Sequence, residues 1–161
     1  MKILLIQTGG SIDKDYPKTK LGFAFEITDS AALRVLEKIN PSFEYEFLSL
    51  FKKDSLLITN EDRIELYQVC KNAMSDKIII THGTDTMIET AEILSDIKNK
   101  VIIITGSFRP EQLKNSDADF IIGVATGALN ILKEGVYVAM NGCVFKHNEV
   151  SRDDNGKFIK K

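Results

Sequence analysis

The sequence contains few of the residues that mark specialised classes of protein. Among its 161 residues there are only two cysteines and three prolines. Cys70 and Cys143 lie far apart and have neither a Cys-x-x-Cys nor a Cys/His metal spacing, so the sequence favours two reduced thiols over a disulfide framework or a zinc site. Three prolines and ten glycines are too few for a collagen-like or low-complexity chain.

Long apolar runs and an excess of one charge are also missing. No window approaches the roughly 18 apolar residues of a membrane helix. The apolar run after Lys2 is shorter than the core of a signal peptide, which has about 7 residues or more. The 21 basic and 23 acidic residues give a net charge of -2, without the basic excess that binds phosphate backbones. We therefore expect a cytoplasmic protein that binds neither membranes nor nucleic acids.

What the sequence does contain is the composition of an ordinary globular domain, with 43% hydrophobic and 27% charged residues. A chain of this length can bury roughly two-thirds of the surface that its unfolded form exposes, so it needs no disulfide or metal to hold a core. We expect one domain over residues 1–150. Residues 151–161 are polar, and we expect them to form a C-terminal extension, as a turn, a short edge element or a mobile tail.

Apolar runs alternate with helical patterns along the chain. The helical patterns have apolar residues at three-to-four spacing. The alternation of buried strands with helices predicts a three-layer α/β/α fold with a mostly parallel sheet, similar to flavodoxin-like and Rossmann-like domains. The expected strands are 2–7, 43–50, 77–81, 101–105 and 135–140, and the expected helices are 28–39, 59–74, 85–97 and one that begins at 116.

Three of the expected helices begin beside residues that can cap them. A side-chain oxygen at the first position accepts a backbone N–H of the first turn, and an acidic residue three positions later can complete a capping box. The candidate caps are Thr28 or Asp29, Thr59 with Asp62, and Ser116 with Asp119.

In parallel α/β sheets, ligands bind outside the carboxyl ends of the strands. The loops to consider are then 8–21, 52–58, 82–85 and 106–115. The first of these opens with Thr8, Gly9, Gly10 and Ser11, which place a hydroxyl at the end of the strand and follow it with backbone that can approach a ligand closely. A nucleophile could lie here. Taken alone, however, so short a motif favours a tight turn or a phosphate-binding loop.

The loop after the third strand carries a second group of polar residues. Thr84 offers a hydroxyl, Asp85 offers a carboxylate, and the N–H groups that open the next helix suit a developing oxyanion. The alternative is that Thr84 or Asp85 only caps that helix. His82 has no visible partner, so we expect a packed, hydrogen-bonded histidine rather than a catalytic base.

Three motifs at the strand ends, TGGSI, HGTDTMIETA and TGSFRP, together resemble the bacterial-type L-asparaginase family. Weaker similarity continues through KKDSLLIT and VAMNGCVF, so the resemblance covers essentially the whole chain. The familiar members have a second, smaller C-terminal domain. This sequence therefore resembles the short, single-domain members, with the fold of the asparaginase N-terminal domain.

The resemblance implies an amidohydrolase that converts L-asparagine to L-aspartate and ammonia through a threonine acyl-enzyme, without a metal or organic cofactor. Thr8 matches the nucleophilic threonine of the family. Thr84 and Asp85 match its proton-transfer pair, and the aspartate of that pair also holds the α-ammonium of the substrate. Ser55 matches the serine that binds the α-carboxylate.

The resemblance also implies further contacts and one departure. We expect Gly10 and Gly83 to contribute to substrate binding, together with Tyr16 as the tyrosine of the flexible loop. A gap-free count from VAMNGCVF places Arg152 where the family has a proton-relay lysine. Arginine keeps its proton at ordinary pH, so Arg152 can orient Asp85 but cannot accept a proton.

Two other functions remain open. Arg152 and the missing second domain favour a protein that binds asparagine or aspartate in the same pocket with little or no turnover, and Leu56 replaces a polar residue that often follows the binding serine. A flavodoxin-like nucleotide-binding module would use TGGSI as a phosphate loop, but no lysine follows it as in a P-loop. A homodimer or higher homo-oligomer is expected, because the rim of the site is open where a second domain would pack.

Overall fold

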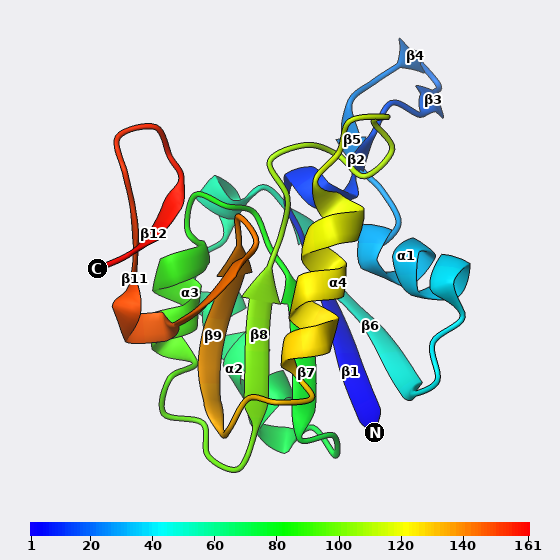
Figure 1. Cartoon of the computed structure of the whole chain (residues 1–161). Helices are drawn as coiled ribbons and strands as arrows, with labels where there is room; N and C mark the ends of the chain where they lie inside the picture. The colour runs from blue at the N-terminus through cyan, green and yellow to red at the C-terminus, as the bar shows by residue number, and fades with distance from the viewer.

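The computed structural model describes all residues, 1–161, and has a central sheet between two layers of helices (Figure 1). The sheet has six strands in the order β10-β9-β8-β7-β1-β6, of which all but β10 are parallel. This confirms the expected three-layer α/β fold. The order of the parallel strands reverses beside β1, and the crevice at such a point is where doubly wound sheets bind ligands. The strands are β1 (Lys2–Gly9), β6 (Glu44–Lys53), β7 (Lys77–Thr81), β8 (Val101–Thr105), β9 (Gly135–Met140) and β10 (Cys143–Lys146).

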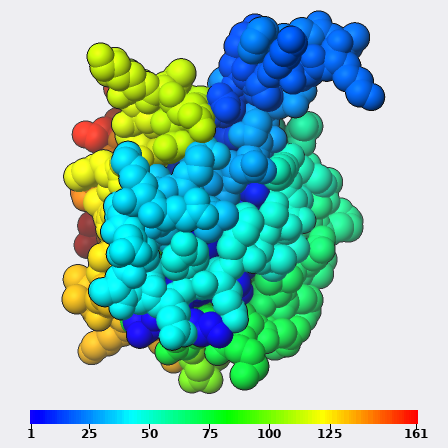
Figure 2. Space-filling model, turned by 90° about the vertical axis from the view of Figure 1, so that its right-hand side faces the viewer, coloured from blue at the N-terminus to red at the C-terminus, as the bar shows by residue number.

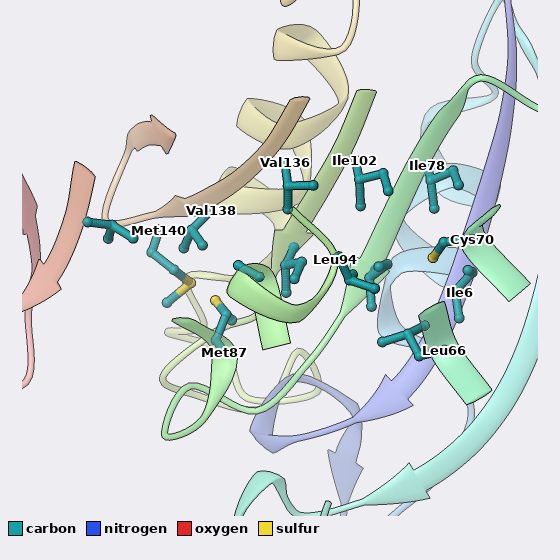
Figure 3. Packing of buried hydrophobic residues seen from close by; sticks show 14 of the residues in the cluster. Ile6, Leu66, Cys70, Ile78, Met87, Leu94, Ile102, Val136, Val138 and Met140 are labelled. Atoms are coloured by element: carbon teal, nitrogen blue, oxygen red, sulfur yellow. The ribbon is translucent and has the colours of Figure 1, made fainter. Parts of the chain in front are cut away.

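Helices cover both faces of the sheet. One core cluster packs α1 and α4 against residues such as Ile79 and Ile103, and the other packs α2 and α3 against Ile78 and Ile80 (Figure 3). Because neighbouring residues of a strand point to opposite faces, strands covered on both sides must be apolar throughout. No helix is both long and apolar enough to cross a membrane. The helices are α1 (Ala31–Ile39), α2 (Asn60–Asn72), α3 (Met87–Ile93) and α4 (Ala118–Ala128).

The sequence predicts three strands with their correct bounds, β7, β8 and β9, but underestimates β1 and β6. β1 continues beyond the apolar run because Gly9 still pairs with Lys53 of β6, so Thr8 lies inside the sheet rather than in a loop. The third helix is shorter than expected, since α3 ends at Ile93 and the chain then forms turns.

The helix caps confirm one expectation and correct two others. Thr59 and Asp62 form the predicted capping box at the start of α2. Ser30 caps α1 instead of Thr28 or Asp29, because its hydroxyl accepts the N–H of Leu33 at 3.3 Å. Thr28 instead donates its own N–H to the Asp13 carbonyl at 2.8 Å.

At the fourth helix, the expected support of the cap by Asp119 is wrong. The Asp119 carboxylate pairs with Lys38 of α1 at 2.7 Å. Ser116 does take part in the cap, because its hydroxyl accepts the N–H of Ala118 at 3.0 Å. Asp119 therefore joins two neighbouring helices rather than completing its own.

Residues 14–27, which we call the arm, project from the body of the domain (Figures 1 and 2). The strands of the arm are not expected from the sequence. The arm follows the 3-10 helix η1 (Ser11–Asp13), and it exposes the aromatic rings of Tyr16, Phe23 and Phe25. Within the arm, β2 (Lys14–Asp15) pairs with β5 (Glu26–Ile27), and β3 (Lys18–Thr19) pairs with β4 (Gly22–Phe23).

The C-terminal residues form an antiparallel hairpin that belongs to the core. Its strands, β11 (Val150–Arg152) and β12 (Phe158–Lys160), follow the 3-10 helix η3 (His147–Glu149). Val150 and Phe158 are buried in the same cluster as α2 and α3. The core therefore continues past the expected boundary at residue 150, because one large apolar residue, Phe158, anchors an otherwise polar segment.

We predict that Phe158→Ala lowers the free energy of unfolding by about 3–5 kcal/mol, because the side chain is 2% exposed and its loss leaves a cavity. The matched control is Ile159→Ala on the same strand, where the side chain is 38% exposed and a loss of less than about 1 kcal/mol is expected. Urea unfolding measures both variants. Equal, small losses would contradict the placement of the hairpin in the core.

Candidate active site

The loops after β1, β6 and β7 meet at the carboxyl edge of the sheet. Gly9 and Gly10 have φ angles of 107° and 90°, which side chains rarely adopt. A Cβ at Gly9 would lie 2.5 Å from the Lys53 carbonyl oxygen, and a Cβ at Gly10 would lie 2.5 Å from the Cα of Gly83. The N–H of Gly10 donates to Lys53 O at 3.0 Å. Only glycine permits these three backbones to come so close.

Ser55 lies against the same point of contact. It begins the 3-10 helix η2 (Ser55–Leu57), is 1% exposed, and would have its hydroxyl 2.6 Å from a Cβ at Gly83. The Thr86 hydroxyl donates to the Ser55 carbonyl at 2.9 Å, which joins η2 to the loop before α3. The structure thus brings together Gly10, Ser55 and Gly83, three of the residues expected to bind substrate.

The two hydroxyls at the end of β1 differ in their surroundings. Thr8 is fully buried, and its hydroxyl donates to the Thr81 carbonyl at 2.7 Å. Ser11 lies just beyond the glycine pair, is partly exposed, and makes no side-chain hydrogen bond within the chain. A hydroxyl that attacks a substrate must be reachable and able to give up its proton. As the residues stand, Ser11 meets that requirement better than Thr8.

Thr84 and Asp85 follow Gly83; Thr84 is partly exposed and Asp85 is exposed. The Arg152 Nη1 group lies 3.2 Å from Asp85 Oδ1 and donates to the Thr84 carbonyl at 3.4 Å. The structure therefore places the expected cation beside the expected carboxylate. The Asp85 side chain is 50% exposed, so water screens this ion pair and its energy is up to about 1 kcal/mol.

The C-terminal hairpin holds Arg152 in this position. Its Nε donates to the Gly156 carbonyl at 3.0 Å, and its guanidinium lies 5.4 Å from the centre of the Phe158 ring. Gly156 has a φ of 77°, and a Cβ there would lie 2.7 Å from the guanidinium. The hairpin turn, the Phe158 ring and the core beneath them therefore hold the Arg152 guanidinium in place beside the half-exposed Asp85 carboxylate.

Tyr16 and Leu56 lie apart from this contact. The Tyr16 ring is stacked on Phe23 of the arm at 5.9 Å and is 60% exposed, without a hydrogen bond to the expected site residues. Leu56 is 72% exposed beside Ser55 and offers an apolar surface there. The arm nevertheless meets the site at its base, since Lys14 pairs with Asp54 at 3.1 Å.

His82 is packed and hydrogen-bonded, as expected from the sequence. Burial lowers its pKa to about 4, and the nearby charge of Arg63 acts in the same direction. The Arg63 Nε can only donate, and it does so to the Thr90 hydroxyl at 3.1 Å. Thr90 then donates to His82 Nε2 at 2.9 Å, which leaves Nδ1 to donate to the Gly83 carbonyl at 2.7 Å. His82 thus supports the backbone of the site and has no free nitrogen for catalysis.

Asp13 is a buried carboxylate that is not expected from the sequence. It is fully buried, and its Oδ1 accepts the N–H of Ala31 at 2.8 Å, which ties the loop after β1 to the start of α1. Its Oδ2 accepts the Thr81 hydroxyl at 3.5 Å. Burial raises the pKa of Asp13 to about 6, although the N–H of Ala31 and the charge of Arg34 act against this rise.

The sequence contains only a partial signal for Ser11 and none for Asp13, the two residues of the site that it did not single out. For Ser11 the signal was the glycine pair, since β1 ends at Gly9 and Ser11 is the first residue with a side chain beyond the sheet. Asp13 had no distinctive signal, because an aspartate that follows a glycine turn is usually an exposed turn residue.

Comparisons with known proteins find one family repeatedly. The family model described as asparaginase, N-terminal, matches residues 2–158. The L-asparaginase of Thermococcus kodakarensis is 31% identical over 158 residues, which are 94% of this chain and 48% of that protein. The glutaminase-asparaginase of Acinetobacter glutaminasificans is 26% identical over 165 residues, with 95% and 50% covered.

Solved structures show the same relationship. The thermostable L-asparaginase from Thermococcus kodakarensis matches with a TM-score of 0.85 and 28% identity, over 99% of this chain and 51% of that chain. The chain therefore spans about half the length of the relatives it matches.

The opposite pKa shifts of Asp13 and His82 predict how stability depends on pH. Between about pH 4 and 6 the folded protein holds more protons at Asp13 than the unfolded chain does, so the contribution of Asp13 to stability falls as pH rises. At His82 the unfolded chain holds more protons, so that contribution rises with pH. Asp13→Asn removes one of two opposing contributions. We expect its stability to climb more steeply with pH than that of the wild type.

Between about pH 4.5 and 6.5, the changes in the free energy of unfolding of the two proteins should differ by about 2 kcal/mol, since a tenfold change in proton affinity is worth about 1.4 kcal/mol. Urea unfolding of both proteins at about pH 4.5 and about pH 6.5 measures it. Parallel pH dependence in the two proteins would show that Asp13 is not titrating in this range.

Proposed function

The chain belongs to the asparaginase family, and on this basis we propose that it is an amidohydrolase that converts L-asparagine to L-aspartate and ammonia. The observation that carries the proposal is the contact between the glycines after β1 and β7, with Ser55 packed against it. Ser11 follows Gly10 and Thr84 follows Gly83, so both residues come directly after the point where the two loops touch. A cytoplasmic location is part of the same proposal.

We assign the attacking hydroxyl to Ser11 rather than to Thr8, because Thr8 is buried and its hydroxyl proton is already donated to Thr81 O. In the first step the hydroxyl oxygen of Ser11 bonds to the side-chain amide carbon, its proton passes to the leaving nitrogen, and ammonia departs. In the second step water attacks the ester, aspartate leaves and the Ser11 hydroxyl is restored.

The substrate would be held by the residues around the attacking group. Ser55 supplies a hydroxyl for the α-carboxylate, and Asp85, oriented by Arg152, supplies a negative charge for the α-ammonium. Leu56 offers no polar contact, so we expect weaker binding than a polar side chain at that position would give. The arm would contribute Tyr16 only by moving toward this site.

The proposed site lacks a ready proton acceptor. Arg152 cannot accept a proton, and both ring nitrogens of His82 are engaged in hydrogen bonds. The proton of Ser11 would therefore pass through the Thr84 hydroxyl or water. General base assistance is typically worth about 10²- to 10⁴-fold, so we expect slow turnover.

Substitution of each hydroxyl tests the assignment of the nucleophile. We expect Ser11→Ala to lower ammonia release from L-asparagine by at least about 100-fold, because no bond to the substrate can form. Thr8→Val keeps the shape of its side chain and should retain activity within about tenfold. An assay of ammonia release, run also with L-glutamine, measures both. Loss of turnover in Thr8→Val with activity retained in Ser11→Ala would instead make Thr8 the nucleophile.

Binding of L-aspartate, followed by calorimetry, is the control for both variants, and it should persist in Ser11→Ala. A wild-type protein that binds L-aspartate but releases no ammonia would overturn the enzymatic proposal and leave a binding protein.

Ser55→Ala should have a different signature. Because Ser55 is assigned to the α-carboxylate, which is bound equally in the ground and transition states, we expect KM to rise while kcat changes little. Steady-state kinetics separate the two constants. A fall in kcat at unchanged KM would place Ser55 in the chemical step.

Arg152 can be tested against both alanine and lysine. Arg152→Ala removes the cation beside Asp85, and an ion pair worth up to about 1 kcal/mol corresponds to roughly a fivefold loss of kcat/KM. Arg152→Lys keeps the charge and adds a group that can give up its proton, so turnover should be retained or rise, with the larger gain at high pH. Ammonia release is measured against pH. An unchanged rate in Arg152→Ala would remove this residue from the site.

A further inference from the structure

Arg63 is a charged side chain on the buried face of α2. That face also carries Leu66 and Cys70, which lie in the core (Figure 3). Arg63 is 6% exposed, and it is the only lysine or arginine of the chain that is buried. Burial of a charge is unfavourable unless polar groups pair with it, so the contacts of Arg63 must satisfy its guanidinium.

Each nitrogen of the Arg63 guanidinium has a partner. Nη1 donates to the Ile58 carbonyl at 3.0 Å, Nε donates to the Thr90 hydroxyl at 3.1 Å, and Nη2 donates to the Glu89 carboxylate at 3.4 Å. The Glu89 side chain is 68% exposed, so water screens that ion pair. The two buried bonds, to Ile58 and Thr90, therefore determine what the guanidinium holds in place.

The bond to Ile58 reaches the short helix that carries Ser55. Ile58 directly follows η2, and its N–H donates to the Ser55 carbonyl at 3.3 Å. The same carbonyl accepts the Thr86 hydroxyl at 2.9 Å. The loop before α3 thus holds η2 at its start, and Arg63 holds it at its end. One attachment would let so short a helix pivot, whereas two attachments fix its orientation.

The direction of the Ser55 hydroxyl depends on the orientation of η2. The side chain is 1% exposed and makes no hydrogen bond within the chain. Gly83 lies against it, since a Cβ there would be 2.6 Å from the hydroxyl oxygen. The backbone of η2, rather than a partner of the hydroxyl, therefore sets where this group points.

The bond to Thr90 reaches the other side of the candidate site. Thr90 and His82 are both buried, and the Thr90 hydroxyl donates to His82 Nε2 at 2.9 Å. His82 Nδ1 in turn donates to the Gly83 carbonyl at 2.7 Å, in the loop that leads to Asp85. One guanidinium is therefore connected to the loops after β6 and after β7.

We propose that Arg63 is a positioning residue that fixes Ser55 relative to the loop carrying Asp85, and that it thereby makes the site select α-amino acids. The inference rests on the proposed function, in which Ser55 binds the α-carboxylate and Asp85 binds the α-ammonium. Both substrate groups are attached to the same carbon atom, so their partners must keep one separation closely. Arg63 acts on that separation through its bonds to the two loops.

Binding of two unreactive ligands tests the proposal without any need for turnover. Succinate is L-aspartate without the α-amino group, so the ratio of their dissociation constants reports the α-ammonium contact. Calorimetry should give tighter binding of L-aspartate in the wild type. Arg63→Met should reduce that preference by about tenfold or more, because a misplacement of about 1 Å is costly in a site of this kind. An unchanged preference in a folded Arg63→Met protein would overturn the proposal.

Two further variants separate positioning from a general loss of stability. Thr90→Val keeps the shape of the side chain and every charge but breaks the connection to His82, so it should reduce the same preference. Arg34→Met removes an arginine of α1 that bonds to Glu111 and to neither loop. Its preference should stay within about twofold of the wild type, since distant sites act independently. Equal reductions in Arg34→Met and Arg63→Met would refute a positioning role.

Arg63→Lys tests whether the charge or the planar fork is needed. Lysine keeps the charge but replaces the fork by a compact ammonium, so it cannot hold Ile58 and Thr90 in the same geometry. We expect KM for L-asparagine to stay raised in Arg63→Lys, with a smaller change in kcat, because the α-groups are bound equally in the ground and transition states. Recovery of the wild-type KM would show that charge alone suffices and would overturn the two-sided role.

The role of Arg63 and the proposed activity can fail separately. A wild-type protein that prefers L-aspartate but releases no ammonia would overturn the amidohydrolase, and loss of that preference in Arg63→Met would still support the role of Arg63. A wild type that releases ammonia, with an unchanged preference in Arg63→Met, would overturn the role of Arg63 alone.

Discussion

The candidate site depends on the close contact of three backbones at the end of β1. Gly9 lies against Lys53, and Gly10 lies against Gly83, so a single Cβ at either glycine would push the loops apart. The positive φ angles of the same residues turn the chain out of the sheet at once. One constraint therefore explains why the loops of the candidate site lie close together and why they are exposed. The strands are held rigidly because both of their faces are buried, and the glycines allow the ends of these strands to touch.

Beneath this contact lie two buried titratable groups, Asp13 and His82, whose pKa values shift in opposite directions. Asp13 ties the loop after β1 to α1 through the N–H of Ala31, and His82 supports the loop after β7 through the carbonyl of Gly83. Burial disfavours the charged form of both side chains, so the pKa of Asp13 rises while that of His82 falls. Each residue lends its hydrogen bonds to a different side of the site, and the pH dependence of their contributions largely cancels between about pH 4 and 6.

The parts of this structure that sequence could predict are those governed by local apolar pattern. β7, β8 and β9 have their expected bounds because each is a short, mostly apolar run that is largely buried. The placement of Thr8 could not be predicted in this way, since it depends on the long-range pairing of Gly9 with Lys53. The same holds for Asp13, whose burial requires α1 and β7, and for Phe158, whose anchoring role appears only once the core is assembled. Motif resemblance points to the loops of the candidate site, but it could not distinguish a buried hydroxyl from an accessible one.

The C-terminal hairpin links hydrophobic packing in the core to the positions of the charged side chains in the candidate site. Phe158 is buried in the core, its ring faces the guanidinium of Arg152, and Arg152 in turn contacts Asp85. An exposed ion pair gains little by itself, because water screens it and the long side chain loses freedom when it is held. Here the Phe158 ring and the Gly156 carbonyl hold Arg152 in the folded protein, so its side chain loses conformational freedom on folding and not when substrate binds. The orientation of Asp85 therefore depends on hydrophobic burial two contacts away, so the stability of the hairpin and the affinity of the site that we propose are physically linked.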